Sequence, residues 1–242
     1  MSLQFIIGSS GIGKTHYACE QIIRESMENP QHLYYIIVPE QFTMQTQKNV
    51  VEMHPGKGIL NIDVLSFQRL AYRIFEETGG AREVLLDDTG KSMVLQKLVQ
   101  QHRKNLPYLG SQMNKPGYLD EVKSLISEFM QYDIREEELQ DMLGKTGEDS
   151  LLHMKMQDVG VLYQAFLQYL EGHYMTGEGV MDALKKAIPF SDKLKKSVLL
   201  LDGFTGFTPV QMNVIRELLA VCDQVLVTVT MDVKENPLQM GK

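Results

Sequence analysis

The sequence has 242 residues, of which 43% are hydrophobic and 23% are charged, and its formal net charge at pH 7 is -7. This length and composition belong to a globular chain with room for one large domain or two small ones, and they exclude a disordered or fibrous protein. The acidic balance argues against tight, autonomous binding to a nucleic acid backbone, because such binding depends on clustered Lys and Arg side chains.

The chain carries only two cysteines, Cys19 and Cys222, which are too few for a disulfide framework or a four-cysteine metal site. Its first residues have neither the basic start nor the apolar run of a secretion signal. The longest aliphatic run, Val198–Leu201, is far shorter than a membrane span. We therefore expect a reduced, cytoplasmic protein that does not bind a membrane.

Both ends of the chain alternate between predicted strands and predicted helices. Short, apolar, β-branched runs that end in turn residues are typical of buried parallel strands. Such runs occupy Leu3–Ile7, Tyr34–Val38, Ile59–Val64, Val198–Leu201 and Val225–Val229. Helical patterns follow the first three strands, at Lys14–Met27, Thr43–Met53 and Ser66–Thr78. The alternation predicts an α/β fold with a parallel sheet that helices cover on both faces.

The middle of the chain has a different pattern, because apolar residues recur at helical spacing and no run has the character of a strand. We expect helices over 87–104, 118–132, 134–143, 151–175 and 177–188. The sheet is thus predicted to be begun by residues 1–80, interrupted by an all-helical insertion at 81–194, and resumed by residues 195–242.

A glycine-rich motif follows the first predicted strand and fits the phosphate-loop pattern G-x-x-x-x-G-K-[ST] without a mismatch. Its residues are Gly8, Ser9, Ser10, Gly11, Ile12, Gly13, Lys14 and Thr15. The glycines allow a tight turn that brings backbone N–H groups close to phosphate oxygens, and the following helix directs its positive end at the same anion. Lys14 adds a positive charge for the outer phosphates, and Thr15 offers a hydroxyl to Mg²⁺. The alternative is a turn that merely begins a helix, which explains the glycines but not the Lys-Thr pair.

Asp202 ends the apolar strand Val198–Leu201 and is the predicted second ligand of the magnesium ion. We expect its strand to lie next to the strand before the motif. The most informative single observation is the distance between the Asp202 carboxylate and the Thr15 hydroxyl, because about 4–6 Å would fit two groups that share one Mg²⁺ ion, given metal–oxygen distances of about 2 Å. The alternative is an Asp that only ends a strand. The next residue is Gly203, so the glutamate that activates water in helicase-like motors is missing. We therefore expect ATP and Mg²⁺ to be bound and hydrolysed slowly or not at all, and we assign no catalytic residue.

Several motifs together resemble one family. They are Ser2–Thr15, Val38-Pro39-Glu40-Gln41, Leu65–Ala71 and Leu200–Pro209. In combination they are similar to the AddB family, the B subunits of bacterial AddAB helicase–nucleases that resect double-strand DNA ends for recombination. The resemblance implies a phosphate-loop, RecA-like domain (1A-like) at 1–80 and 195–242 with a helical insertion (1B-like) at 81–194. It also implies that the chain is an N-terminal piece of a longer polypeptide whose nuclease domain lies elsewhere.

The resemblance further implies two partners, the A subunit and DNA. By position, the loops after the second and third strands are those that touch single-stranded DNA in related helicases, which makes Gln41, Ser66 and Arg69 candidate DNA contacts. The alternative assigns Ser66 to a helix N-cap and the other two to the surface. Two other functions remain open: a structural module with a vestigial loop that contacts the A subunit and DNA, and a small-molecule kinase that uses the same loop.

Overall fold

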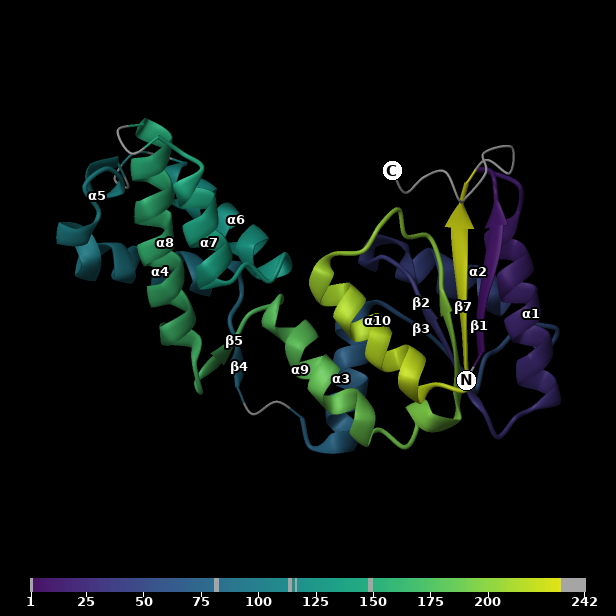
Figure 1. Cartoon of the computed structure of the whole chain (residues 1–242). Helices are drawn as coiled ribbons and strands as arrows, with labels where there is room; N and C mark the ends of the chain where they lie inside the picture. The colour runs from purple at the N-terminus through teal and green to yellow at the C-terminus, as the bar shows by residue number, and fades with distance from the viewer. Residues whose placement is uncertain (1, 81–82, 113–114, 116, 148–149, 232–242) are drawn as a thin grey trace. The chain divides into compact units, whose positions relative to one another are not determined.

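The computed structural model describes residues 2–80, 83–112, 115, 117–147 and 150–231 (Figure 1). These residues form two compact units. Of the described residues, the first unit, which is α/β, contains 2–80, 181–207 and 211–231, whereas the second contains those between 83 and 180 and 208–210. The predicted insertion ends at 194, so the structure assigns the residues between 181 and 194 to the α/β unit. Residues 232–242 of the predicted sheet domain lie outside the described residues.

The α/β unit is built on one five-stranded, all-parallel sheet with the order β1–β7–β6–β2–β3. The strands are β1 (Ser2–Gly8), β2 (Leu33–Ile37), β3 (Ile62–Leu65), β6 (Ser197–Leu201) and β7 (Gln224–Thr230). The predicted α/β fold with a parallel sheet is confirmed. The expectation that β6 lies next to β1 is wrong, because β7 pairs with both of them. Sequence patterns identify strands but carry no information on which strands pair.

Four helices cover the sheet, two on each face. Helices α1 (Lys14–Glu28) and α2 (Thr43–Met53) share a core with alternate strand residues. The members of that core include Ala18, Ile22, Val50, Ile36, Leu200 and Leu226. Helices α3 (Phe67–Thr78) and α10 (Pro209–Val221) belong to the opposite face, where the other strand residues, such as Ile37 and Leu199, are buried. Figure 1 shows α1 on one side of the strands and α10 with α3 on the other.

β1 is less buried than its sequence predicts, because it is the edge strand of the sheet in the described chain. Its side chains alternate between the two faces. Ile6 packs on the α1 side, whereas Leu3, Phe5 and Ile7 are 44%, 55% and 47% exposed on the other. The apolar run that predicts a strand buried on both faces is therefore covered on one face only.

The second unit is mainly helical and has its own core. Its helices are α4 (Asp88–His102), α5 (Leu109–Gln112), α6 (Tyr118–Gln131), α7 (Glu136–Gly144) and α8 (Leu151–Leu170). Their apolar stripes meet in one cluster that includes Leu95, Ile126, Leu162 and Phe166. A further helix, α9 (Gly179–Ala187), lies at the boundary between the units in the sequence. No helix in the described parts of the chain is both long and apolar enough to span a membrane.

The expectation of a wholly helical insertion is wrong in one respect. The strands β4 (Val84–Leu85) and β5 (Tyr174–Met175) pair in parallel and form a second, two-stranded sheet. The helix predicted over 151–175 accordingly ends at Leu170. Two residues are too few to show the alternation by which a strand is recognised, so sequence patterns could not reveal this pair.

Candidate functional site

The glycine-rich motif forms the turn between β1 and α1, and each of its glycines has a separate reason. Gly11 and Gly13 have φ values of 78° and 93°, in the left-handed region that residues with a Cβ atom avoid. A Cβ atom on Gly8 would lie 2.8 Å from Cγ2 of Ile12. The turn therefore depends on glycine at all three positions, as its pattern in the sequence predicts.

The N-terminus of α1 has no side-chain cap. Ser66, Asp87 and Ser150 cap α3, α4 and α8 with their side chains, whereas the N-cap residue of α1 is Gly13 and its first turn holds no acidic residue, as is also true of the first turn of α2. The first N–H groups of a helix lack intrahelical partners, and that end carries a partial positive charge. The ammonium group of Lys14 adds to this charge, because its Nζ donates to the Ser9 carbonyl 2.8 Å away, over the turn. An anion is the complementary ligand for this end of the helix.

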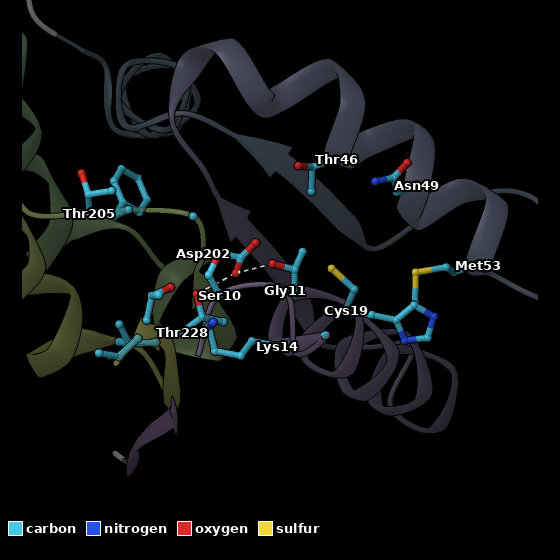
Figure 2. A pocket seen from close by; sticks show the side chains of 18 of the residues that line it. Ser10, Gly11, Lys14, Cys19, Thr46, Asn49, Met53, Asp202, Thr205 and Thr228 are labelled. Carbon is cyan, nitrogen blue, oxygen red and sulfur yellow. Dashed lines mark hydrogen bonds between the residues drawn. The ribbon is translucent and has the colours of Figure 1, made fainter. Parts of the chain in front are cut away.

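Asp202 lies at the end of β6 and meets the turn directly. Its Oδ1 accepts a hydrogen bond from Oγ1 of Thr15, 187 positions away, at 3.0 Å, and a second one from Oγ1 of Thr228 at 2.6 Å (Figure 2). The carboxylate is only 4% exposed. This distance is shorter than the 4–6 Å that would fit two groups sharing an ion, and the two groups are in direct contact although β7 lies between β1 and β6.

Thr228 is a residue that sequence reasoning missed. It projects from β7, the strand between β1 and β6, and is buried. A signal was present, since Thr228 and Thr230 interrupt an otherwise apolar strand near its carboxyl end, where parallel sheets place their binding groups. These two threonines can be interpreted only once β7 is known to lie between β1 and β6.

These groups open onto a cavity of about 1130 Å³ that lies within the α/β unit. Its lining includes the turn residues Ser10, Gly11, Gly13, Lys14 and Thr15. It also includes Thr46, Asn49, Glu52 and Met53 of α2, the segment 202–207 and the end of β7 (Figure 2). Ligand cavities typically measure about 300–1,000 Å³, so this one has room for a nucleotide-sized molecule.

Cys19 forms part of the cavity wall and reports on the charge of Asp202. Burial raises the pKa of the Cys19 thiol to about 12, and the negative charge of Asp202 contributes to the same shift. The thiol is only 2% exposed. It is therefore neutral and unreactive near neutral pH, as expected for a buried free cysteine.

The backbone after Asp202 explains why Gly203 stands where helicase-like motors have a glutamate. Gly203 has a φ of 75°, which a residue with a side chain adopts only under strain. Two residues of the following segment, Phe204 and Phe207, pack on Phe67 of α3, with ring centroids 5.5 and 6.4 Å away. The strand thus ends in a tight turn held by an aromatic cluster.

The three candidate DNA residues lie apart from the described lining of the cavity. The Ser66 hydroxyl is buried and accepts a hydrogen bond from the Arg69 backbone N–H, so it caps α3. The Arg69 side chain is half-exposed and pairs with Glu40 at 3.1 Å. Gln41 is exposed on a short 3-10 helix, Glu40–Phe42. The hydrogen bond of Ser66 is that of a helix N-cap. Gln41 and Arg69 are the two candidate DNA residues whose polar side chains are exposed.

Two oxygen groups that could bind one cation meet here, but the described side chains do not form a complete protein metal site. Among the residues that the structure describes, no group of three or more His, Cys, Asp or Glu side chains is arranged to hold a metal ion. One carboxylate and one hydroxyl suit Mg²⁺, which usually keeps several waters and takes its other ligands from phosphate groups. The donor set therefore fits a magnesium ion that arrives with a phosphorylated ligand.

The fold and the site define a class: an α/β parallel-sheet protein with a glycine-rich, anion-complementary turn and a carboxylate at the carboxyl edge of the sheet. Comparison with protein families makes this specific. The family model described as "ADDB, N-terminal" matches residues 5–241, and the chain belongs to this family. The predicted resemblance, which rests on motifs at both ends of the chain, is confirmed, and the match extends through the helical middle.

Individual relatives agree with the family match. The chain is 46% identical over 232 residues to a protein of Lachnoclostridium phytofermentans, and 33% identical over 232 residues to one of Alkaliphilus metalliredigens. Each of these two proteins is named as the B subunit of an ATP-dependent helicase/deoxyribonuclease. In each case the match covers 96% of this chain and 20% of the relative. The chain therefore spans about a fifth of the length of these relatives.

Proposed function

We propose that the α/β unit is a phosphate-loop, RecA-like domain that binds ATP with Mg²⁺. In this proposal the residues Gly8–Thr15 hold the phosphates through backbone N–H groups, and Lys14 contributes a charge-assisted contact. The observation that carries the proposal is the hydrogen bond of 3.0 Å between Thr15 and Asp202, because it joins two motifs from distant parts of the sequence at the uncapped end of α1. A turn that merely begins a helix has no need of a buried carboxylate beside it.

Thr15 and Asp202 are the proposed protein ligands of the magnesium ion, and Thr228 orients the carboxylate by its bond of 2.6 Å. A bound Mg²⁺ ion neutralises phosphate charge and fixes the orientation of the nucleotide. In the free protein the Thr15 hydroxyl donates its hydrogen to the Asp202 carboxylate, whereas in the complex a lone pair of the same oxygen would face the cation, and a rotating hydroxyl makes this change easily. The same residues thus hold each other in the free protein and share one ion in the complex.

Hydrolysis by this part of the protein is proposed to be weak or absent. Asp202 and Glu52 are the acidic side chains among the described residues that line the cavity, and Asp202 is assigned to the metal. A glutamate at position 203 would need the strained φ of 75°. The turn therefore provides no glutamate at position 203 to activate a water molecule. We propose that the site binds ATP to stabilise one conformation of the protein and not to hydrolyse it rapidly.

For the whole polypeptide we propose the role that its relatives' names state: the B subunit of an ATP-dependent helicase/deoxyribonuclease. That role makes the protein a cytoplasmic DNA repair and recombination factor that processes double-strand ends with an A subunit. The exposed side chains of Gln41 and Arg69 are the proposed DNA contacts, and Ser66 supports them by capping the helix that carries Arg69. Exposed polar side chains at loops after parallel strands suit contacts to a phosphate backbone.

The test measures nucleotide affinity in the full-length polypeptide by titration calorimetry with ATP, with and without Mg²⁺. Loss of a charge-assisted bond of roughly 1.5–3 kcal/mol predicts that Lys14→Ala weakens binding by about 10- to 150-fold. The matched control is Lys145→Ala, which removes an exposed lysine from the other unit. Equal and negligible affinity of the wild type and Lys14→Ala would contradict the proposal and favour a vestigial loop, whereas phosphoryl transfer to a small metabolite would favour the kinase alternative.

A further inference from the structure

The cavity at the glycine-rich turn is larger than its phosphate-binding part requires. Cavities that hold whole small ligands typically measure about 300–1,000 Å³, and this one measures about 1130 Å³. The turn, Lys14 and Asp202 account for the end proposed to hold phosphates and a cation. The rest of the wall includes a segment of α2. A ligand that fills the cavity therefore has a second part, which this segment contacts.

One stripe of α2 faces this part of the cavity. Thr46, Asn49 and Met53 line it and recur at positions i, i+3 and i+7, the spacing of one helix face. Glu52 lines it from the position before Met53, and His16 lines it from the first turn of α1. The two helices share one core with the sheet, so this wall is held in place by packing.

The Glu52 carboxylate does not suit a phosphate group, because two negative charges repel each other. It pairs with the Lys48 ammonium at 3.8 Å, and the two side chains are 64% and 69% exposed, so the pair contributes little and is easily rearranged. A carboxylate is a strong acceptor for hydroxyl groups, and dinucleotide-binding proteins use one to bind the ribose of their ligand. Glu52 therefore suits the sugar of a nucleotide and not its phosphates.

The Asn49 amide offers a donor and an acceptor side by side. Nε2 of Gln45 donates to Oδ1 of Asn49 at 2.8 Å, and this bond orients the amide. A carboxamide pairs with the neighbouring N6 donor and N7 acceptor of adenine, whereas guanine presents two acceptors at the same edge. Met53 and His16 add a thioether and an aromatic ring, groups that pack well on the flat face of a base.

The phosphate end fixes the direction in which a nucleotide would lie. The lysine and the hydroxyl of a phosphate loop act on the outer phosphates and their Mg²⁺ ion, so the nucleoside lies at the end of the ligand away from the metal. In the view of Figure 2, Asn49 and Met53 lie on the far side of Cys19 from Asp202. The stripe on α2 is thus placed where the nucleoside end is required.

We propose that this stripe of α2 is the nucleoside subsite of the cavity and selects adenosine nucleotides. The Asn49 amide binds the N6–N7 edge of adenine, and the Glu52 carboxylate accepts hydrogen bonds from the ribose hydroxyls. Met53 and His16 pack on the faces of the base. This inference rests on the proposed binding of phosphates at the glycine-rich turn, and it adds the residues that distinguish ATP from other triphosphates.

The first test compares ATP with inorganic triphosphate, which lacks the nucleoside, by titration calorimetry on the full-length polypeptide in the presence of Mg²⁺. We expect ATP to bind at least ~10-fold more tightly, since several contacts of a few-fold each are added. Binding of triphosphate with no preference for ATP would overturn the nucleoside subsite and leave the phosphate-loop proposal standing. Failure of both ligands to bind would overturn the phosphate-loop proposal and this inference together.

The second test removes single contacts in the full-length polypeptide. Loss of one hydrogen bond corresponds to about 2- to 12-fold in affinity, so Asn49→Ala is expected to weaken ATP binding by that factor, to reduce the preference for ATP over GTP and to leave triphosphate affinity unchanged. Glu52→Ala is expected to reduce the preference for ATP over 2′-deoxy-ATP. The matched controls Gln47→Ala and Glu28→Ala remove exposed side chains of α2 and α1 outside the described lining of the cavity and should change no ratio. Equal losses of ATP and triphosphate affinity in Asn49→Ala, or unchanged nucleotide preferences in both cavity variants, would overturn the proposal.

Discussion

Two buried charged groups, one in each unit, have different kinds of partner. In the helical unit the Lys91 ammonium contacts both carboxylate oxygens of Glu178 at 2.9 Å, and the two side chains are 8% and 10% exposed. In the α/β unit Asp202 is equally buried, but its described partners are the hydroxyls of Thr15 and Thr228. No Lys or Arg side chain in the described chain forms an ion pair with Asp202.

This difference separates a structural charge from a functional one. A buried ion pair neutralises itself and needs nothing from outside, so Lys91 and Glu178 are explained by the fold of the helical unit. Two neutral hydroxyls orient a carboxylate without neutralising it, and the carboxylate lies at a cavity. A carboxylate at a cavity with no cation of the protein beside it is a suitable ligand for a metal ion, which is the physical basis for proposing it as a magnesium ligand.

The largest expected effect comes from breaking the structural pair. Lys91→Met leaves the Glu178 carboxylate buried without its cation, and we expect a loss of about 3–5 kcal/mol in the free energy of unfolding of the helical unit. Chemical denaturation followed by circular dichroism measures it. The control Lys145→Met breaks an exposed pair with Asp141 and is expected to change stability by less than ~1 kcal/mol. Similar losses for both variants would contradict the structural role of the buried pair.

The same pair predicts a dependence on pH. Burial alone would raise the pKa of Glu178, but the hydrogen bond and charge of Lys91 outweigh it and lower the pKa below the ordinary value of 4.5. A lowered carboxyl pKa contributes stability above the ordinary value, and that stability is lost as the pH falls through the folded-state pKa. Denaturation curves of the wild type should therefore show a loss below pH ~4.5 that Lys91→Met lacks.

The next largest effect contrasts with the first, because Asp202 has no cation to lose in the free protein. Asp202→Asn is expected to leave the stability of the free protein nearly unchanged and to weaken ATP binding in the presence of Mg²⁺ by about 10- to 100-fold, the value of a charge-assisted contact. Calorimetry with ATP, with and without Mg²⁺, separates the effect of the substitution on metal-dependent binding from its effect on binding of the nucleotide alone. A stability loss as large as that of Lys91→Met would show that Asp202 is structural, and the comparison between the units would fail.

How far the sequence predicts this protein depends on whether a feature is local. The β1–turn–α1 segment is read correctly because the apolar strand, the glycines and the helical pattern that follows them lie within one continuous stretch. The longer helices of the second unit are found for the same reason, since periodicity needs only neighbouring residues, whereas the four-residue helix α5 is too short to show it. The short pair β4–β5 is missed because each strand has two residues and is defined only by its distant partner.

The errors at the site have a related cause, since the order of the strands in the sheet cannot be derived from any single stretch of sequence. Asp202 is identified as a candidate from its own strand, but the insertion of β7 between β1 and β6 is not foreseeable, and with it the role of Thr228. The exposure of Phe5 is likewise a property of the edge position and not of the strand's composition. The residue types thus indicate which chemistry a site can perform, whereas the contacts between its residues can be known only from the order of the strands in the sheet.

Helix capping gives a smaller effect and compares the two units directly. Ser66 caps α3 in the α/β unit and Ser150 caps α8 in the helical unit, with N–H to Oγ distances of 3.3 and 3.0 Å. We expect Ser66→Ala and Ser150→Ala each to lower the free energy of unfolding by about 1 kcal/mol. DNA affinity of the full-length protein is the second measurement, and only Ser66→Ala should change it. Equal DNA affinity of both variants and the wild type would remove Ser66 from the proposed DNA surface.

The smallest expected effect concerns the two thiols, one at the cavity and one away from it. Burial raises the pKa of Cys222 to about 11, whereas burial together with the charge of Asp202 raises that of Cys19 to about 12. A raised thiol pKa contributes stability below the ordinary value of 9.0, and this stability is lost as the pH rises above it. Alkylation of Cys19 should therefore be slow up to pH ~9 in a Cys222→Ser background. Asp202→Asn removes one cause of the shift, so it should move the onset of alkylation to lower pH. An unchanged onset in that variant would contradict an electrostatic effect of Asp202 on Cys19 and would leave burial as the cause of the raised pKa.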